Sequence, residues 1–382
     1  MRIAIATLAY LPLPPTKGGA VETLLECISV ENEKYGDLEI DVFSIYDDSV
    51  KGVPGKKKTE YHYINRKKIS KWSCGNVLNK VFKTYKFINV NLKEYVRQIN
   101  KGEYDYVIAT SIFKEVSVVA QKIKAPFIWY LHADALSVLQ EKYVKEIAEN
   151  CRAILTVSDF VSNRIREIGI KCPVLTIMNC SGIEPVAKED EEKITADFRK
   201  KYGIDSDDTV FCFVGRIVPI KGIYELIEAF NKVEFSKKKL LIVGSPSNNA
   251  EKEYFSKVKS ISGENVVFTG YINNKELDRV YCGIDVAVVP STCNEAAGLS
   301  VIEPQLCGRR VIASNMGGIP EYCIDNVLVE CNENFVDNLK DAMEDFCKNK
   351  QTYIASAKRI NMFNQEQYYK DFVHSLNKIK EL

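Results

Sequence analysis

Short apolar runs alternate along this chain with stretches in which apolar residues recur at helical spacing. Residues 1–5 form one such run, and residues 21–28 carry apolar side chains on one predicted helix face. The second half repeats this order, with a run at 209–214 and a helical stripe at 223–230. The pattern predicts buried parallel strands joined by helices, which is an α/β fold. The other predicted strands are residues 39–46, 104–110, 125–132, 153–158, 174–178, 240–244, 266–270 and 285–290.

The length of the chain indicates two domains. A chain of 382 residues is long for one hydrophobic core and comfortable for two. Residues 188–193, with the sequence KEDEEK, predict an exposed connection because nearly every side chain is charged. We therefore predict a first domain at residues 1–184 and a second at residues 185–363.

One segment, residues 51–101, is strongly basic although the net charge of the chain is only +1. It holds fourteen Lys and Arg against Glu60 and Glu94, with aromatic and aliphatic residues interleaved. The lysines form either a solvated helix face with stems that cover the core or a surface for anionic membrane lipid or a lipid-diphosphate acceptor. Nucleic acid is a third possible partner of this segment, but nothing else in the sequence supports it.

The remaining composition predicts a cytoplasmic protein with reduced thiols and no metal site. The twelve cysteines are dispersed, with no C-x-x-C pair and no Cys/His cluster of zinc spacing. The apolar N-terminus is short and prolines follow it, so we interpret it as a strand and not as a signal peptide. No apolar run reaches the length of a transmembrane helix.

The stretch after the predicted strand at 285–290 suits a ligand that is both phosphorylated and polyhydroxylated. Gly298 lets a ligand approach the backbone, and the N–H groups of Leu299 and Ser300 face an anion at the predicted helix start. Glu295 and Glu303 lie eight residues apart, and carboxylates accept hydrogen bonds from hydroxyls. These properties describe a nucleotide sugar, which open α/β sheets bind at the carboxyl ends of their strands.

A second set of candidate residues follows the strand at 209–214. Gly215 ends the strand, and Arg216 and Lys221 flank the loop behind it. Two cations in such a loop neutralise a diphosphate, arginine by bidentate contact and lysine as a point charge.

Two candidate elements lie in the first half of the chain. Gly18 and Gly19 fall between a predicted strand and a predicted helix, where backbone N–H groups can face a phosphate, although a bare turn also fits. His132 ends the strand at 125–132, from which its ring can reach a ligand.

Several of these motifs resemble those of retaining glycosyltransferases with the GT-B architecture, most closely the large family 4. The pair Glu295 and Glu303 resembles the family's E-x7-E motif. Residues 215–222 match the family pattern G-R-x-x-P-x-K-G in full, and residues 317–321 resemble the G-G-x-x-E that closes its donor site.

The resemblance implies a GT-B fold, in which two Rossmann-like domains face each other across a cleft. The second domain binds the donor and the first binds the acceptor, and a last helix at 364–382 crosses back onto the first domain. Tyr271 and Ile272 are then candidates to meet the nucleobase, and His132 takes the place of the family's active-site histidine. Gly18 and Gly19 correspond to the loop that faces the donor diphosphate and the acceptor.

The chain departs from the family pattern at four places. Ala297 stands where an aromatic is common, which predicts a wider sugar pocket. Pro304 replaces an alanine and should kink the helix or mark a late start. Ala133 separates His132 from Asp134, which leaves the role of that carboxylate open, and Cys180 and Ser181 are inserted in the linker motif.

The predicted function is transfer of a sugar from a nucleotide-diphosphate donor, with UDP or GDP as the expected nucleotide. The acceptor is a hydroxyl of a glycan or a lipid-linked molecule, as in cell-surface polysaccharide or glycolipid synthesis, and the resemblance implies retention of the anomeric configuration. Arg216 and Lys221 stabilise the leaving phosphate, Glu295 holds a sugar hydroxyl, and Glu303 binds the ribose. No metal or other cofactor is expected, and the enzyme is expected in the cytoplasm or at the inner face of the membrane.

Two other functions fit the same architecture. A sugar-nucleotide epimerase would consume its UDP-sugar without an acceptor. A catalytically silent partner subunit would bind a nucleotide sugar without transferring it, and retention of the four charged residues Arg216, Lys221, Glu295 and Glu303 argues against this alternative.

Overall fold

The computed structural model describes residues 1–8, 11–66, 80, 85–86, 88–349 and 361–382. These residues form two compact units, Met1–Cys180 with Gln365–Leu382 and Ser181–Asn364. The predicted boundary after Glu184 lies in the same connection, between the last strand of the first unit and the first helix of the second.

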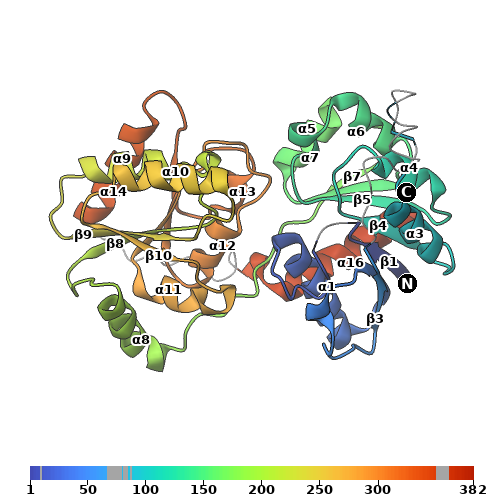
Figure 1. The fold of residues 1–382 in the computed structure, drawn as a ribbon, viewed down its shortest axis with the longest axis horizontal. Helices are drawn as coiled ribbons and strands as arrows, with labels where there is room; N and C mark the ends of the chain where they lie inside the picture. Colours follow the sequence, from blue (N-terminus) through green and yellow to red (C-terminus); the bar gives the residue numbers. More distant parts are fainter. Residues whose placement is uncertain (9–10, 67–79, 81–84, 87, 350–360) are drawn as a thin grey trace. The chain divides into compact units, whose positions relative to one another are not determined.

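The first unit is built on a parallel sheet of seven strands in the order β3-β2-β1-β4-β5-β6-β7 (Figure 1). Its strands are β1 (Arg2–Ala6), β2 (Glu39–Ile45), β3 (Thr59–Ile64), β4 (Tyr106–Ala109), β5 (Phe127–Leu131), β6 (Ala153–Thr156) and β7 (Val174–Thr176). Every residue of β5 is buried, as expected of a parallel strand covered by helices on both faces.

Helices between these strands and one C-terminal helix complete the first unit. They are α1 (Ala20–Tyr35), α3 (Val90–Ile99), α4 (Val116–Lys122), α5 (Ala135–Val138), α6 (Glu141–Ala148), α7 (Asp159–Glu167), α16 (Gln365–Glu381) and the 3₁₀ turn η1 (Asp48–Val50). The C-terminal helix α16 lies beside α1: the rings of Tyr35 and Tyr369 stack at 5.5 Å, and the Tyr369 hydroxyl donates to Asn32 Oδ1 at 2.8 Å.

The second unit repeats the topology with a parallel sheet of six strands in the order β10-β9-β8-β11-β12-β13. Its strands are β8 (Thr209–Val214), β9 (Lys238–Val243), β10 (Val266–Gly270), β11 (Val286–Val289), β12 (Arg310–Ser314) and β13 (Val327–Val329). In both sheets the strand order reverses beside the first strand, between β1 and β4 and between β8 and β11. Open α/β sheets bind their ligands at such switch points.

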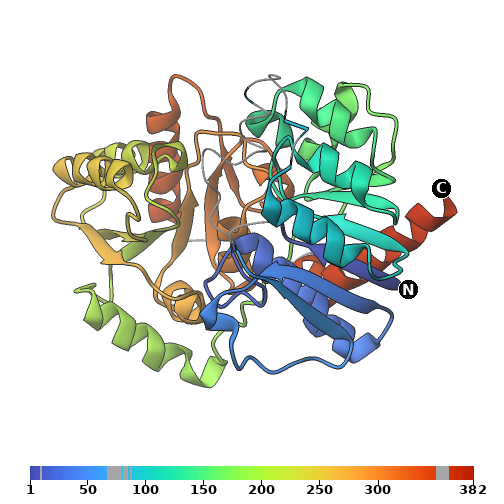
Figure 2. The same ribbon diagram turned by 45° about the vertical axis from the view of Figure 1, so that its right-hand side comes forward.

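Helices cover both faces of the second sheet, with α9, α10 and α14 on one face and α11 and α12 on the other (Figures 1 and 2). They are α8 (Lys188–Lys201), α9 (Ile223–Lys232), α10 (Asn249–Ser260), α11 (Leu277–Gly283), α12 (Leu299–Leu306), α13 (Ile319–Tyr322) and α14 (Phe335–Asn349), with the 3₁₀ turns η2 (Pro219–Lys221), η3 (Asn274–Glu276) and η4 (Asn361–Phe363). The stripe predicted at 223–230 is the buried face of α9.

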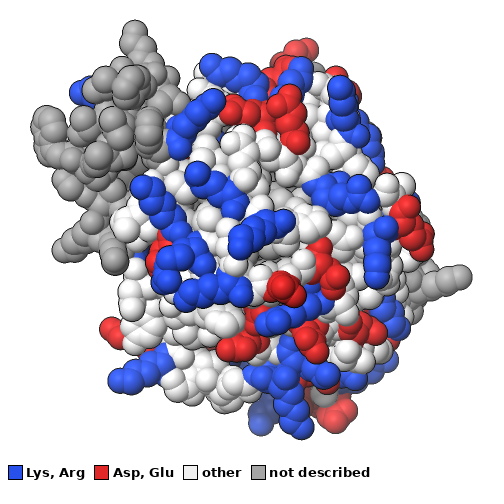
Figure 3. Space-filling model, turned by 90° about the vertical axis from the view of Figure 1, so that its right-hand side faces the viewer, with Lys and Arg blue, Asp and Glu red and all other residues white. Residues whose placement is uncertain are grey.

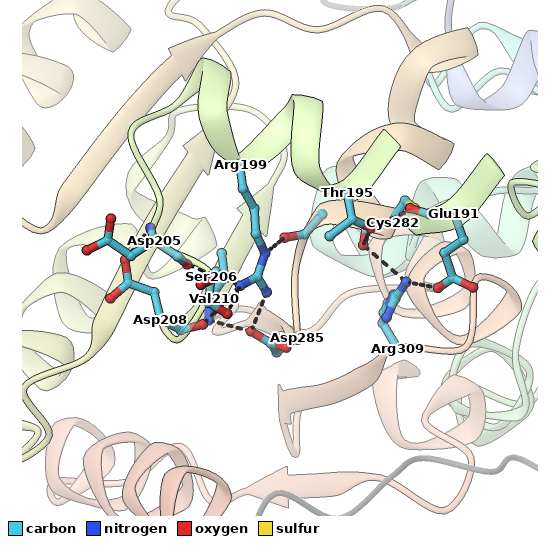
Figure 4. Close-up of polar contacts among 11 residues, drawn as sticks. Glu191, Thr195, Arg199, Asp205, Ser206, Asp208, Val210, Cys282, Asp285 and Arg309 are labelled. Atoms are coloured by element: carbon cyan, nitrogen blue, oxygen red, sulfur yellow. Dashed lines mark hydrogen bonds and ion pairs between the residues drawn. The ribbon is translucent and has the colours of Figure 1, made fainter. Parts of the chain in front are cut away.

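Helix α8, which carries the charge-rich run, is held to the second unit by two arginines (Figure 4). Arg199 donates to Gly283 O at 3.2 Å and ion-pairs with Asp285, whose Oδ2 also accepts the N–H of Val210 at 2.8 Å. Arg309 bridges Glu191 of α8 and the carbonyl of Cys282. The charges of this segment are therefore partly used to dock α8, so the segment is more than a solvated connection.

The prediction for Pro304 was wrong in part. Helix α12 begins at Leu299 and runs through the proline, so the helix does not start late.

Candidate functional site

The loops after β8 and β11 bring Lys221 and Glu295 together. Lys221 Nζ lies 2.8 Å from both carboxylate oxygens of Glu295. The hydroxyl of Ser291, which is fully buried two residues after the end of β11, donates to Glu295 Oε1. β8 and β11 are hydrogen-bonded neighbours, so 74 residues of sequence separation become one contact at the switch point of the sheet.

Two glycines let the backbone close around this ion pair. Gly222 has φ +67°, and a Cβ there would overlap with the carbonyl oxygen of Pro290 at the end of β11. Gly317 has φ +60°, and its Cβ would overlap with the backbone of Glu295. The N–H of Gly318 donates to Glu295 O at 2.7 Å. The G-G-x-x-E loop thus supports the backbone of Glu295, and only glycine fits at both close approaches.

Arg216 follows Gly215 at the end of β8 and is exposed. No other described residue forms a hydrogen bond or ion pair with its guanidinium. Its positive charge acts on Glu251 of α10, whose pKa is lowered first by hydrogen bonds from Ser247 and further by this charge. Arg216 therefore retains its donors for an anionic ligand.

The N-terminus of α12 supplies further donors. Gly298 is the N-cap residue and offers no side chain to the helix. The Gly298 carbonyl accepts from the N–H groups of Val301 and Ile302. The N–H groups of Leu299 and Ser300, which precede them, have no acceptor within the described chain. This is the arrangement in which a helix start binds an anion.

Glu303 lies one turn further along α12, and its carboxylate accepts a hydrogen bond from the Tyr281 hydroxyl at 3.0 Å. Burial raises the pKa of Glu303 to about 7, against the hydrogen bonds from Tyr281 and Ser181, which lower it. A mixture of the acid and the carboxylate is therefore present near neutral pH.

Tyr271 and Ile272 come directly after β10, and the Tyr271 side chain is 69% exposed. Both residues line a pocket of about 410 Å³ together with Phe198 and Tyr202 at the end of α8. The structure thus places the two candidates for the nucleobase at the carboxyl end of a strand, as the sequence predicted, but records no contact between them and the Lys221–Glu295 pair.

The predicted glycine loop of the first unit precedes α1. Gly18 and Gly19 have φ +73° and +107°, so both adopt backbone conformations that favour glycine. The adjacent Lys17 pairs with Asp47 at 2.6 Å, which together with Ser49 lowers the pKa of that carboxyl to about 2. Glu22, in the first turn of α1, is buried beside Gly19, and its burial raises its pKa.

His132 follows β5, and its ring packs on that of Tyr130 at 4.1 Å. Neither ring nitrogen has a hydrogen-bond partner in the described part of the chain. Burial lowers the pKa of His132 to about 3, so the imidazole is neutral at physiological pH. Asp134 caps α5 through the N–H of Leu136 and lies 3.0 Å from Arg164, which gives the carboxylate left open by the sequence a structural role.

Sequence reasoning missed two residues of the site, Ser291 and Tyr281. The position of Ser291 directly after a predicted strand was a usable signal. Tyr281 had none, because its contact with Glu303 joins two helices whose packing only the fold defines. Among described residues, Asp41, Glu60 and His62 lie close enough together to hold a cation, but Asp41 already pairs with Arg2 and His62.

Residues 194–361 match the family model Glycosyl transferases group 1. The chain carries a glycosyltransferase domain. Over 334 residues it is 25% identical to the glycosyltransferase YtcC of Bacillus subtilis strain 168, a match that covers 83% of this chain and 76% of that protein. Over 197 residues it is 28% identical to the lipopolysaccharide 1,2-N-acetylglucosaminetransferase of Salmonella typhimurium LT2, covering 50% of this chain and 51% of that enzyme. The predicted enzyme class is therefore confirmed.

The fold of this glycosyltransferase is shared with HepE of Anabaena, solved in complex with UDP and glucose. The likeness has a TM-score of 0.76 at 16% identity and covers 99% of this chain and 100% of HepE. It confirms the predicted fold class, a GT-B protein with two Rossmann-like domains built on parallel sheets.

The basic segment predicted at 51–101 lies partly outside the described residues, namely at 67–79, 81–84 and 87. Within the described part, Lys56 pairs with Glu26 and Arg97 pairs with Glu94. On the face drawn in Figure 3, Lys and Arg side chains are interspersed with Asp and Glu. None of the described helices combines the length and the apolar composition that crossing a membrane requires.

Proposed function

We propose that this glycosyltransferase is a retaining enzyme of family 4 that moves a sugar from a nucleotide-diphosphate donor to a hydroxyl of a glycan or lipid-linked acceptor. The carrying observation is the contact of Lys221 with Glu295 at the switch point of the second sheet, with the unpaired Arg216 in the same loop as Lys221. The site combines cations for a diphosphate with a carboxylate for a sugar hydroxyl. The UDP in HepE and the named activity of the Salmonella enzyme support a UDP-sugar donor and a role in cell-surface polysaccharide synthesis.

Negative charge grows on the distal phosphate as the bond to the sugar breaks. Arg216, Lys221 and the N–H groups of Leu299 and Ser300 stabilise that charge from fixed positions, so they lower the barrier without reorganisation at the moment of reaction. No metal is needed in this scheme, because these groups neutralise the leaving diphosphate.

Lys221 must divide its donors between Glu295 and the phosphate. An ammonium has three N–H donors, and two carboxylate oxygens lie within its reach in the donor-free enzyme. Ser291 continues to hold Glu295 when the lysine turns toward a phosphate, which leaves the second carboxylate oxygen for a sugar hydroxyl. Glu303 in its carboxylate form accepts hydrogen bonds from the ribose.

The scheme requires no side chain as a covalent nucleophile. The acceptor oxygen bonds to the anomeric carbon on the same face from which the nucleoside diphosphate leaves, and its proton passes to a phosphate oxygen of that leaving group. Bond formation and bond breaking on one face retain the anomeric configuration. His132 contributes a hydrogen bond from a neutral ring and no charge, because its pKa is far below physiological pH.

The proposal is tested in two stages. Thermal-shift measurements with UDP, GDP, ADP and dTDP identify the nucleotide, and its sugars are then offered with glycan and lipid-linked acceptors. The anomeric configuration of the product is read by NMR. An inverted product contradicts the mechanism, and binding of a nucleotide sugar without transfer to any acceptor supports the silent-subunit function. Consumption of a UDP-sugar without any acceptor supports the epimerase instead.

A further inference from the structure

Ser181 is one of the two residues, with Cys180, by which this chain departs from the family's linker motif. It is the first residue of the second unit and is half-buried. Its backbone N–H donates to Phe363 O at 3.0 Å, and its hydroxyl oxygen accepts from the N–H of Ile183 at 3.2 Å. Because a hydroxyl both donates and accepts, the Ser181 O–H group remains a donor in this arrangement.

The acceptor of that donor is the carboxylate of Glu303. The same carboxylate accepts from the hydroxyl of Tyr281 at 3.0 Å, and Tyr281 is fully buried. Glu303 therefore receives one hydroxyl donor from α11 and one from the segment that precedes α8. A carboxylate offers about four lone-pair positions, so about two remain for neighbouring hydroxyls of a ligand.

Ser181 is held by a closed ring of contacts that begins and ends on α12. Its N–H is bound by the carbonyl of Phe363, whose ring stacks on that of Tyr322 of α13 at 5.6 Å. Gln305 Nε2 of α12 donates to Tyr322 O at 2.8 Å, and Gln305 lies two residues after Glu303. Phe363, Tyr322 and Gln305 are at most 1% exposed. A hydroxyl fixed by such buried contacts orients its acceptor before a ligand arrives.

The charge of Glu303 depends on these hydroxyls, since no cation of the described chain acts on it. Burial raises the pKa of Glu303, and the hydrogen bonds from Tyr281 and Ser181 lower it. The titratable groups that face this carboxyl are Tyr281 and Cys307 at the end of α12. Burial raises the pKa of Cys307 to about 12 and that of Tyr281 well above its ordinary value, so both stay neutral while Glu303 titrates. The hydroxyl donors therefore influence how much of Glu303 is carboxylate near neutral pH.

We propose that Ser181 is a positioning residue of the donor site, which holds Glu303 as a carboxylate oriented toward the ribose of the nucleotide. The contact of Glu303 with ribose rests on the proposed function, whereas the effect of Ser181 on Glu303 does not. Tyr281 is the second residue that holds this carboxylate. The role in nucleotide binding thus extends to a linker residue outside the loops that the sequence motifs identify.

The first measurement is UDP affinity by calorimetry between pH 6 and pH 9, in the wild type and in Ser181→Ala. Loss of one hydrogen bond to the carboxylate should raise the pH at which affinity increases by about 0.5–1 pH unit. UDP affinity should then be about 2- to 6-fold weaker in Ser181→Ala than in the wild type at pH 7, and nearly equal at pH 9. Titration of the UDP phosphate is common to all variants and cancels in this comparison.

Two variants control this measurement. Ser181→Thr keeps the hydroxyl and should restore the pH profile of the wild type. Ser262→Ala is the matched control, because Ser262 is also half-buried in the second unit, follows the end of α10 and donates to Val258 O at 2.9 Å. Its pH profile should equal that of the wild type.

The second measurement needs no nucleotide. The pKa of Glu303 is followed by NMR of protein labelled with ¹³C at the glutamate side-chain carboxyl, and Glu303→Gln assigns its signal. This pKa should rise by about 0.5–1 pH unit in Ser181→Ala but not in Ser181→Thr or Ser262→Ala. Tyr281→Phe should raise it as well, because that substitution removes the other hydroxyl donor.

An unchanged Glu303 pKa in Ser181→Ala overturns the proposal, whether or not UDP binds. A loss of UDP affinity that is equal at pH 7 and pH 9 also overturns it, because that pattern is expected when a substitution disturbs only the linker. A raised Glu303 pKa in a protein that binds no nucleotide supports the positioning by Ser181 while the proposed function fails. Thermal melting at both pH values checks that each variant is folded.

Discussion

Lys221 Nζ sits 2.8 Å from both carboxylate oxygens of Glu295, so a residue predicted to bind phosphate and one predicted to bind sugar form a single ion pair in the donor-free enzyme. The side chains are 20% and 12% exposed. At such partial burial a pair loses most when one partner is removed, because the other charge is left uncompensated. The two residues should therefore be treated as one unit in mutagenesis.

Arg216→Ala and Lys221→Ala should each reduce turnover by roughly 10²–10³, the scale for losing one donor to transition-state charge, while nucleotide binding falls less. The double mutant should lose less than the product of the two effects, because both cations act on one phosphate. Transfer rate and nucleotide affinity are measured for all three variants. Near wild-type turnover in either single variant, or complete loss of activity with a metal chelator, contradicts the mechanism.

Glu303→Ala should weaken nucleotide binding by about 10- to 100-fold, as for a charge-assisted hydrogen bond of roughly 1.5–3 kcal/mol. The Michaelis constant for the donor should rise more than kcat falls, because ribose contacts are made equally in the ground and transition states. In the wild type, affinity should increase as pH rises through about 7, where Glu303 becomes a carboxylate. Calorimetry across pH 5.5–8.5 measures the nucleotide affinity of the variant and the pH dependence of affinity in the wild type, with Glu264→Ala, at an exposed position, as control. Unchanged affinity in Glu303→Ala would assign the residue a structural role.

The same carboxyl should make folding stability depend on pH. The pKa of Glu303 is about 7 in the folded protein against an ordinary value of 4.5, so the folded state binds the proton more tightly. Its contribution is complete below pH 4.5 and is lost as pH rises through 7. Between pH 5 and pH 8 the free energy of unfolding should therefore fall by roughly 1–3 kcal/mol less in Glu303→Gln than in the wild type, since one pKa unit corresponds to about 1.4 kcal/mol. Urea unfolding at the two pH values measures this, and equal losses would mean that the carboxyl is ionised in the folded protein throughout.

Gly222→Ala should destabilise the second unit and disturb the site, because its Cβ would overlap with the carbonyl oxygen of Pro290. Gly203 offers a matched control, with φ +64° against +67° for Gly222 and open space around its Cβ. Gly203→Ala should cost only the strain of positive φ, about 1–2 kcal/mol, and Gly222→Ala clearly more. Denaturant unfolding of both variants compares them directly. Equal losses of stability in the two variants would show that the loop around Gly222 moves to accommodate the added Cβ at little energetic cost.

Residues 51–101 should give salt-dependent association with anionic membranes, since each lysine near such a surface contributes about 1 kcal/mol and is screened within a Debye length. Lys57→Glu with Lys58→Glu should weaken sedimentation with anionic vesicles at low salt. The same charge change at Lys188 and Lys193, outside the segment, serves as control. Equal binding to neutral and anionic vesicles, or to neither, would leave the segment a solvated face.

The sequence by itself determined the class of fold and the residue types in the loops that we propose bind the donor. Apolar runs buried on both faces, such as β5, are visible because a parallel strand needs no polar face. Motifs within one loop, such as residues 215–222, are also visible, since spacing along the chain determines which groups they present. The sequence could therefore name Arg216, Lys221 and Glu295 individually.

Only the tertiary structure decided which of these groups touch and in what state. The Lys221–Glu295 pair and the hydrogen bond from the Tyr281 hydroxyl to Glu303 each join segments far apart in the chain. The pKa values of His132 and Glu303 depend on burial, which has no local signature in the sequence. Residue type and spacing specify what a side chain can do, whereas desolvation and hydrogen-bond partners arise only when the strands are ordered side by side.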